Sequence, residues 1–400
     1  MRFLSGGVTA ALAMVLLIGP AAVVSAQESR EAAIATAQAE KAKTLTPYVP
    51  SKAETRVKKL EGVLFSAPRG LYPYFGSVYS GGGLALGAGF RQYYGDNTHW
   101  DLKGLYSIKS YKLIEFTTDA WDLASGRINL HARAGYRDAT QVAYHGLGPD
   151  SSRDRANYRM KQAAVGGGLG ARPVGYTVFG ASATYEDYTL ESGSGSRQPS
   201  IEEVFTPATA PGLGASPTYI HTSASGGLDW RPSPGYARRG GLYEVTYHNY
   251  ADRKDTYSFD RVDGEIVQHV PLLRENWVLS LHGLVQTTLG DDDLVPHFLL
   301  PSLGGGSTLR GYGSWRFRDR HSILTSGEFR WIPSRLALDL AVFYDAGKVA
   351  SRREDLSLRH LRHDIGLGIR LHTPAATPLR IEFARGNEGL RLVFAGGAAF

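Results

Sequence analysis

The residues that most clearly point to a chemical role lie in one segment, where three consecutive glycines precede an Arg-Gly-Tyr sequence. Gly304, Gly305 and Gly306 permit a sharp reversal of the backbone, and Gly311 lets the chain approach a neighbouring wall closely. Arg310 lies between these two features and would be carried inward with them. A guanidinium enclosed by protein needs a carboxylate partner, so the segment predicts an internal ion pair rather than a catalytic centre.

The partner of this arginine can be predicted from the alternation of side chains in the segments that follow. From 336 to 347 the even-numbered residues are apolar or aromatic, which places Phe343 and Asp345 together on the opposite face. Glu328 takes the same side of the preceding segment. We therefore expect Arg310 to pair with Asp345, to share Glu328, and to stack on Phe343 or a neighbouring aromatic ring. The alternative is a solvated arginine in a mobile external loop.

The elements that must position this pair are β-strands with one apolar face and one charged or glycine-rich face. Segments of about ten residues with every second residue apolar run from Leu71 to the last residue, separated by turn-forming residues. Residues 365–372 and 379–385 show the same alternation clearly. Strands of this length cross a hydrocarbon layer at a tilt, so the pattern predicts a membrane barrel with a polar lumen. A secreted, water-soluble β-protein remains the alternative.

The connections between these segments support the barrel independently. About sixteen strands can be counted from Leu71, and the links after even-numbered strands are mostly short. Long links follow odd-numbered strands, at 139–156, 191–217, 290–320 and 350–362. Short turns at one end and long loops at the other are typical of outer-membrane barrels. The sequence thus predicts an all-β, 16-stranded antiparallel transmembrane β-barrel with a short N-terminal helical extension.

Composition and motifs exclude several other classes. No apolar run of about 18 residues follows the N-terminal segment, which argues against a helical membrane protein. With no cysteine there is no disulfide and no thiolate metal site, and the net charge of +6 is too diffuse to indicate a nucleic-acid partner. Nucleophile-elbow, P-loop and zinc-protease motifs do not occur. We expect no enzyme activity, metal or cofactor, although a barrel enzyme can assemble its catalytic residues from distant strands.

The N-terminal segment has the parts of a secretory signal peptide. A basic start, an apolar stretch and the small residues before Gln27 predict cleavage after residue 26. Residues 27–70 then form a periplasmic extension, and residues 71–400 form the barrel. We expect the mature protein in the bacterial outer membrane, in contact with its lipid and lipopolysaccharide.

Residues 303–312 resemble the signature of the BamA/TamA superfamily, the bacterial surface antigen barrels that insert or translocate outer-membrane proteins. Further resemblances follow in order at 328–331, 343–347, 366–368 and 394–400, and the last of these is expected to be a closing strand that ends in the aromatic Phe400. The resemblance implies that Arg310, Gly311 and Tyr312 sit inside the barrel, and that client outer-membrane proteins or a periplasmic partner are bound. About 44 residues precede the barrel after the signal peptide, too few for a POTRA domain. The alternative function is a passive channel or porin, and the oligomeric state is left open.

The seam between the first and last strands is a second candidate site. Pro73 cannot donate a ladder hydrogen bond, and Gly396 and Gly397 should weaken the last strand. The resemblance implies that such a closure opens sideways toward lipid, whereas the simpler interpretation is that these residues shape the ends of the barrel. For the terminal Phe400 the resemblance implies recognition by the host's assembly machinery, which is compatible with a place among the interfacial aromatics.

Overall fold

The computed structural model describes Thr36, which is helical, and residues 69–400 except 96, 196, 274–275, 291–293 and 334–336. The predicted signal peptide and, apart from Thr36, Arg69 and Gly70, the predicted extension lie outside these residues. The chain divides into two units, residues 1–66 and residues 67–400, and the second is described here.

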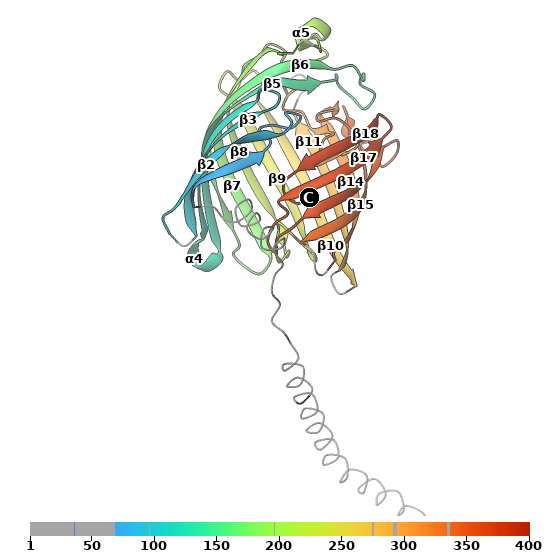
Figure 1. Ribbon diagram of the computed structural model, residues 1–400. Helices are drawn as coiled ribbons and strands as arrows, with labels where there is room; N and C mark the ends of the chain where they lie inside the picture. The colour runs from blue at the N-terminus through green and yellow to red at the C-terminus, as the bar shows by residue number, and fades with distance from the viewer. Residues whose placement is uncertain are drawn as a thin grey trace, which may run out of the picture. The chain divides into compact units, whose positions relative to one another are not determined.

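This second unit is one antiparallel sheet of 16 strands, in which each strand pairs with its neighbours in chain order (Figure 1). The predicted 16-stranded antiparallel barrel is confirmed. The strands of the sheet are β1 (Gly70–Gly76), β2 (Ala85–Tyr93), β3 (Thr98–Ser107), β4 (Lys112–Asp122), β5 (Ile128–Tyr144), β6 (Ala156–Ala171), β7 (Thr177–Ser192), β8 (Thr218–Asp229), β9 (Gly240–Asp252), β10 (Phe259–Leu273), β11 (Trp277–Leu289), β14 (His321–Trp331), β15 (Leu338–Ala350), β16 (Arg362–Leu371), β17 (Leu379–Gly386) and β18 (Gly389–Ala395).

Long loops and short turns lie at opposite ends of the strands, as the sequence predicts. The loop between β11 and β14 holds a two-stranded sheet, β12 (Ser302–Leu303) and β13 (Phe317–Arg318). The short helix α5 (Ile201–Val204) and the 3-10 helix η1 (Arg353–Asp355) also lie in long loops, whereas α4 (Leu123–Gly126) forms a short turn. Figure 1 shows α5 and α4 at opposite ends of the barrel. Below, these are called the loop end and the turn end.

The outer surface is apolar because the alternation along each strand is strict. In β16, Ile365, Leu367 and Ile369 are 57%, 60% and 48% exposed, while Asp364 before them and Arg370 after them are buried. Tryptophans gather where strands meet the turn end, as in the aromatic girdles of membrane barrels: Trp121, Trp277 and Trp331. Within the described residues, no helix is both long and apolar enough to span a bilayer.

The lumen differs in part from the polar bore that the sequence predicts. Toward the loop end, inward-facing strand residues and loop residues pack into a large apolar and aromatic cluster. Members of this cluster, here called the cap, include Tyr144, Tyr158, Tyr219, Val295 and Phe298. Tyrosines can occupy such inward positions because their rings pack while their hydroxyls find partners; Tyr144, for example, donates to the Thr209 carbonyl at 2.5 Å. The predicted polar wall is present toward the middle and the turn end.

The two edge strands of the sheet are β1 and β18, and no ladder joins them in the described part of the chain. Pro73 lies in β1 opposite Ala88 of β2, so it is on an edge strand as its missing N–H requires. The predicted closing strand over 394–400 is wrong in part. β18 ends at Ala395, and Gly396 and Gly397 follow it rather than weakening it from within. Gly397 has a φ of +85°, a conformation that lets the chain leave the strand direction.

Candidate functional site

The guanidinium of Arg310 lies inside the barrel among acidic side chains. Its Nε and Nη2 atoms donate to the two carboxylate oxygens of Asp345 at 2.7 and 2.8 Å. Its Nη1 donates to Glu328 at 3.1 Å and to Glu382 at 3.2 Å. The guanidinium carbon lies 3.4 Å from the centre of the Phe343 ring, which gives a cation–π contact. The structure thus brings together the four residues named from sequence and adds Glu382, with Arg310 only 2% exposed.

Further arginines complete this group, here called the ion cluster. Arg370 pairs with Glu328 and, at 2.9 Å, with Glu382, while Arg380 pairs with Glu382 at 3.0 Å. Arg370 and Arg380 are direct cross-strand neighbours, an arrangement that is unfavourable for like charges unless carboxylates separate them. The alternation of β17 already placed Arg380 and Glu382 on the face opposite Ile381. That signal could have identified Glu382 as a candidate.

The glycines of the inserted loop are required by close approach and by backbone conformation. Gly304 and Gly305 have φ values of +112° and +106°, whereas no positive φ is recorded for Gly306. A Cβ added to Gly311 would lie 2.5 Å from the Cβ of Asp364, so only glycine fits against the wall. Tyr312 follows and is buried, with its hydroxyl donating to the His363 carbonyl at 3.2 Å.

The same loop contacts the chain beside both edge strands. Trp315 stacks on Tyr79, with ring centres 5.1 Å apart, and its Nε1 donates to the Ser80 carbonyl at 3.0 Å. Both partners lie in the loop that follows β1. Arg316 pairs with Glu388, in the turn that precedes β18, at 2.8 Å. The loop therefore bridges the seam from within.

The cap is held by a buried arginine that bonds to neutral groups. Arg318 donates to the hydroxyl of Tyr158 at 3.2 Å and to the His297 carbonyl at 2.9 Å. His297 in turn has its Nδ1 3.0 Å from the Pro211 carbonyl, which joins the β11–β14 loop to the β7–β8 loop. Together these bonds close the lumen at the loop end.

The cap is expected to loosen in acid because two histidines beside it are buried in the neutral form: His297, which bonds the two loops, and His145, which follows Tyr144 of the cap in the chain. Burial, with Arg318 nearby, lowers the pKa of His297 to about 3, and burial beside Arg316 lowers the pKa of His145 to about 4. In an unfolded loop these histidines take up a proton near pH 6.5, whereas in the folded cap they do so only at a lower pH. The cap therefore loses stability as pH falls below about 6.5, by up to about 1.4 kcal/mol per histidine for each pH unit.

Limited proteolysis of the long loops between pH 7.5 and pH 4 measures this effect. We expect cleavage to increase toward pH 4 and His297→Gln to reduce the increase. Cleavage that is independent of pH in this interval, after correction for protease activity, contradicts the prediction.

A second closure lies at the turn end. The β8–β9 turn (residues 230–239) reaches the β16–β17 turn (372–378), although four strands separate β9 from β16 in the sheet. The Tyr236 hydroxyl donates to Asp339 at 2.9 Å, and the Tyr236 ring stacks on His372 with centres 4.2 Å apart. Thr377 donates its hydroxyl to the Gly235 carbonyl at 3.1 Å. We call this arrangement the turn-end bridge. The sequence pattern does not predict this bridge, because the contact joins two turns that are distant in the chain.

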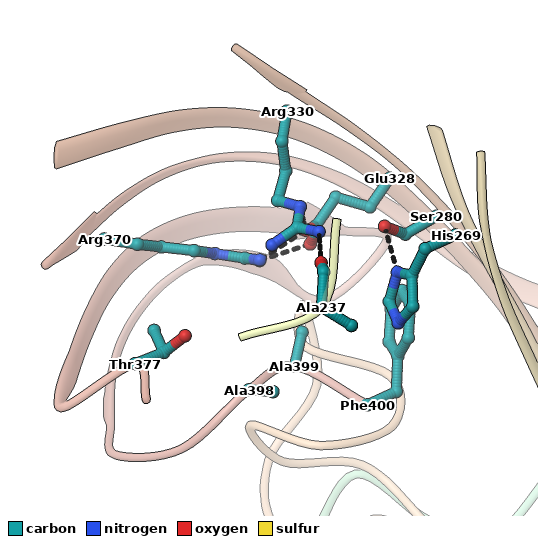
Figure 2. A pocket seen from close by; sticks show the side chains of 10 residues that line it. All are labelled: Ala237, His269, Ser280, Glu328, Arg330, Arg370, Thr377, Ala398, Ala399 and Phe400. Carbon is teal, nitrogen blue, oxygen red and sulfur yellow. Dashed lines mark hydrogen bonds and ion pairs between the residues drawn. The ribbon is translucent and has the colours of Figure 1, made fainter. Parts of the chain in front are cut away.

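The C-terminal residues fold inward beside this bridge (Figure 2). The Phe400 ring stacks near His282 and His269, with centres 5.0 and 6.4 Å away. The Gly397 amide donates to the Thr377 carbonyl at 2.9 Å. The expectation that Phe400 ends the last strand is therefore corrected. His269 also bonds to Ser280 at 2.8 Å, but Ser280 is 1% exposed and Phe400 covers the histidine, so this pair is closed to a substrate.

A 16-stranded barrel with an apolar exterior and a long loop fixed inside its lumen defines an outer-membrane barrel. More particularly, the chain belongs to the Omp85 superfamily, whose domain matches residues 93–397. It is similar in fold to the crystal structure of BamA from Haemophilus ducreyi lacking POTRA domains 1-3, with a TM-score of 0.55 and 17% identity over 82% of this chain and 68% of that one. No curated protein sequence matches it.

Across residues 69–400, where described, no group of three or more His, Asp or Glu side chains is placed to hold a metal ion.

Proposed function

We propose that this protein assists the insertion or translocation of outer-membrane proteins, without enzymatic turnover. The observation that carries the proposal is the pair of sheet edges, β1 and β18, that meet no partner strand in the described chain. An edge strand presents unpaired N–H and C=O groups, and an extended client segment can add to it by main-chain hydrogen bonds. Membership of the Omp85 superfamily supports this proposal.

The contacts at the seam suit an edge that opens and closes. The edge strands are short, and β18 is largely exposed. What ties them together is the inserted loop, through Trp315 on one side and Arg316 on the other. A few side-chain contacts are weaker than a ladder of backbone bonds along two strands, so separation at the seam costs less than separation elsewhere in the sheet.

The competing proposal is a passive diffusion channel. A channel needs a continuous polar path, whereas here the cap fills the loop end and the bridge crosses the turn end. Two closures in series favour insertion over conduction.

Folding of a client barrel into liposomes tests the proposal. We expect liposomes that contain the protein to accelerate folding of a small outer-membrane barrel relative to empty liposomes, as followed by its gel-mobility shift. Ser77→Cys and Asn387→Cys, exposed residues next to the loop ends of β1 and β18, allow a cleavable bismaleimide to tether the seam. The tether should abolish the acceleration and its cleavage should restore it.

Equal client folding rates with and without the protein would overturn the proposal. Acceleration that survives the tether would show that the seam is not the site of action.

A further inference from the structure

We propose that the outer, lipid-facing surface at the loop ends of β15, β16 and β17 binds the phosphates of lipid A, the phosphorylated glycolipid portion of lipopolysaccharide. The site consists of Lys348, His363 and Arg385, with Arg359 of the β15–β16 loop beside them. This inference is independent of the proposed function.

Strand register places the three side chains on the outside. His363 lies two residues before Ile365, and Arg385 two residues after Phe383, so each shares the face of a residue that is 57% or 49% exposed. Ile365 and Arg385 are direct cross-strand partners, which makes His363 and Arg385 diagonal neighbours within reach of one ligand. Lys348 lies on the exterior face of β15, opposite Ile323 of β14.

The positive charge of this surface is not neutralised from within the protein. The two cross-strand neighbours of Arg385 are apolar, Ile365 and Leu390, and no carboxylate in the described chain pairs with its guanidinium. The lumenal Arg310, Arg370 and Arg380, by contrast, all meet carboxylates. An arginine at the apolar exterior of a membrane protein therefore needs an anion from outside the chain.

The β15–β16 loop adds a further cation to the same surface. The Lys348 ammonium donates to the Ser357 hydroxyl at 3.2 Å and to the Arg359 carbonyl at 3.4 Å, which holds the loop against β15. Arg359 itself is exposed. Arg352 is excluded from the site because Glu354 and Asp355 pair with it.

The surface below the cations is apolar, which selects an amphiphile over a free anion. Tyr344 stacks near His363, with ring centres 6.0 Å apart. Exposed Val342, Leu367 and Phe383 are neighbours across three strands, one step further from the loop end than Arg385, and extend the band toward the membrane middle. A ligand with phosphates above acyl chains matches both halves of this surface. The loop end is the outer leaflet side of an outer-membrane barrel, where lipid A provides that combination.

Retention of lipid A by the full-length protein tests the site. Detergent-solubilised protein is incubated with phosphatidylcholine bicelles doped with diphosphorylated lipid A, and bound lipid is quantified by native mass spectrometry. We expect Arg385→Ala to weaken binding by roughly fivefold and the Lys348→Ala, His363→Ala, Arg385→Ala triple variant by more than tenfold, at about a factor of five per basic residue. Arg127→Ala, an exposed arginine in a turn at the opposite end, is the matched control and should bind as the unmodified protein does.

Two further arms separate the sources of phosphate. Dephosphorylated lipid A should bind as weakly to the unmodified protein as lipid A binds to the triple variant, and inorganic phosphate at 10 mM, about a hundredfold excess over lipid, should displace little lipid. Equal binding by the triple variant and the control would overturn the proposal. Displacement by inorganic phosphate would also overturn it, because the surface would then be a simple anion site. All substituted residues are exposed or half-exposed, so folding is expected to be unaffected.

Discussion

Replacing Arg310 with alanine is expected to destabilise the folded barrel by about 3–5 kcal/mol, the usual result of removing one partner from a buried ion pair. Asp345 loses its bidentate partner and is left fully buried. The cross-strand neighbour of Asp345 is Asp364, which is also buried. In the variant, these two carboxyl groups would face each other with no guanidinium beside them. Glu328 and Glu382 keep Arg370, which limits the damage to one side of the cluster.

Urea unfolding in detergent micelles, read by the gel-mobility shift of the folded barrel, measures this loss. The double variant Arg310→Ala, Asp345→Asn should recover part of the stability, because it removes the orphaned charge as well as its partner. Arg359→Ala, at an exposed arginine of another loop, should change stability by no more than about 0.5 kcal/mol. An Arg310→Ala protein as stable as the Arg359→Ala protein would refute a structural role for the ion cluster.

The part of this cluster that could be predicted depended on short-range signals. A two-residue period fixes which face Phe343 and Asp345 occupy, and the glycines around Arg310 show that this segment can approach a wall. Glu382 was placed on the correct face by the same period. Its contact with Arg310 nevertheless depends on how the loop enters the barrel, which no pattern within one strand records.

The features missed by sequence reasoning are those made by contacts between distant turns and loops. Tyr236 and His372 lie in two separate turns, and neither turn has a periodic pattern that would point to the other. Phe400 was placed on the strand because its aromatic character fits a strand end, but the alternation stops at Ala395 and the positive φ of Gly397 redirects the chain. The cap was missed because inward-facing tyrosines count as polar residues in an alternating pattern, whereas in the folded barrel their rings pack as apolar groups.

Removing both closures of the lumen is expected to convert a poorly conducting barrel into an open pore, whereas removing either one alone is not. Arg310→Ala releases the inserted loop from the ion cluster. Because this loop also supplies Val295 and Phe298 to the cap, its release loosens the cap but leaves the turn-end bridge in place. Tyr236→Ala removes the stack on His372 and the hydrogen bond to the fully buried Asp339, which leaves that carboxylate without its hydroxyl partner. Since the two closures act in series, conductance should remain low in each single variant.

Single-channel recordings in planar bilayers measure the effect. We expect rare, small openings for the unmodified protein and for each single variant, and large steady openings for Tyr236→Ala combined with Arg310→Ala. Tyr176→Ala, at an exposed tyrosine in another short turn, is the matched control in the Arg310→Ala background and should leave conductance low. Tyr236→Phe keeps the ring stack and should give an intermediate result, because only the bond to Asp339 is lost. If Arg310→Ala alone conducts as fully as the double variant, the bridge does not close the lumen, and the argument from two closures in series fails.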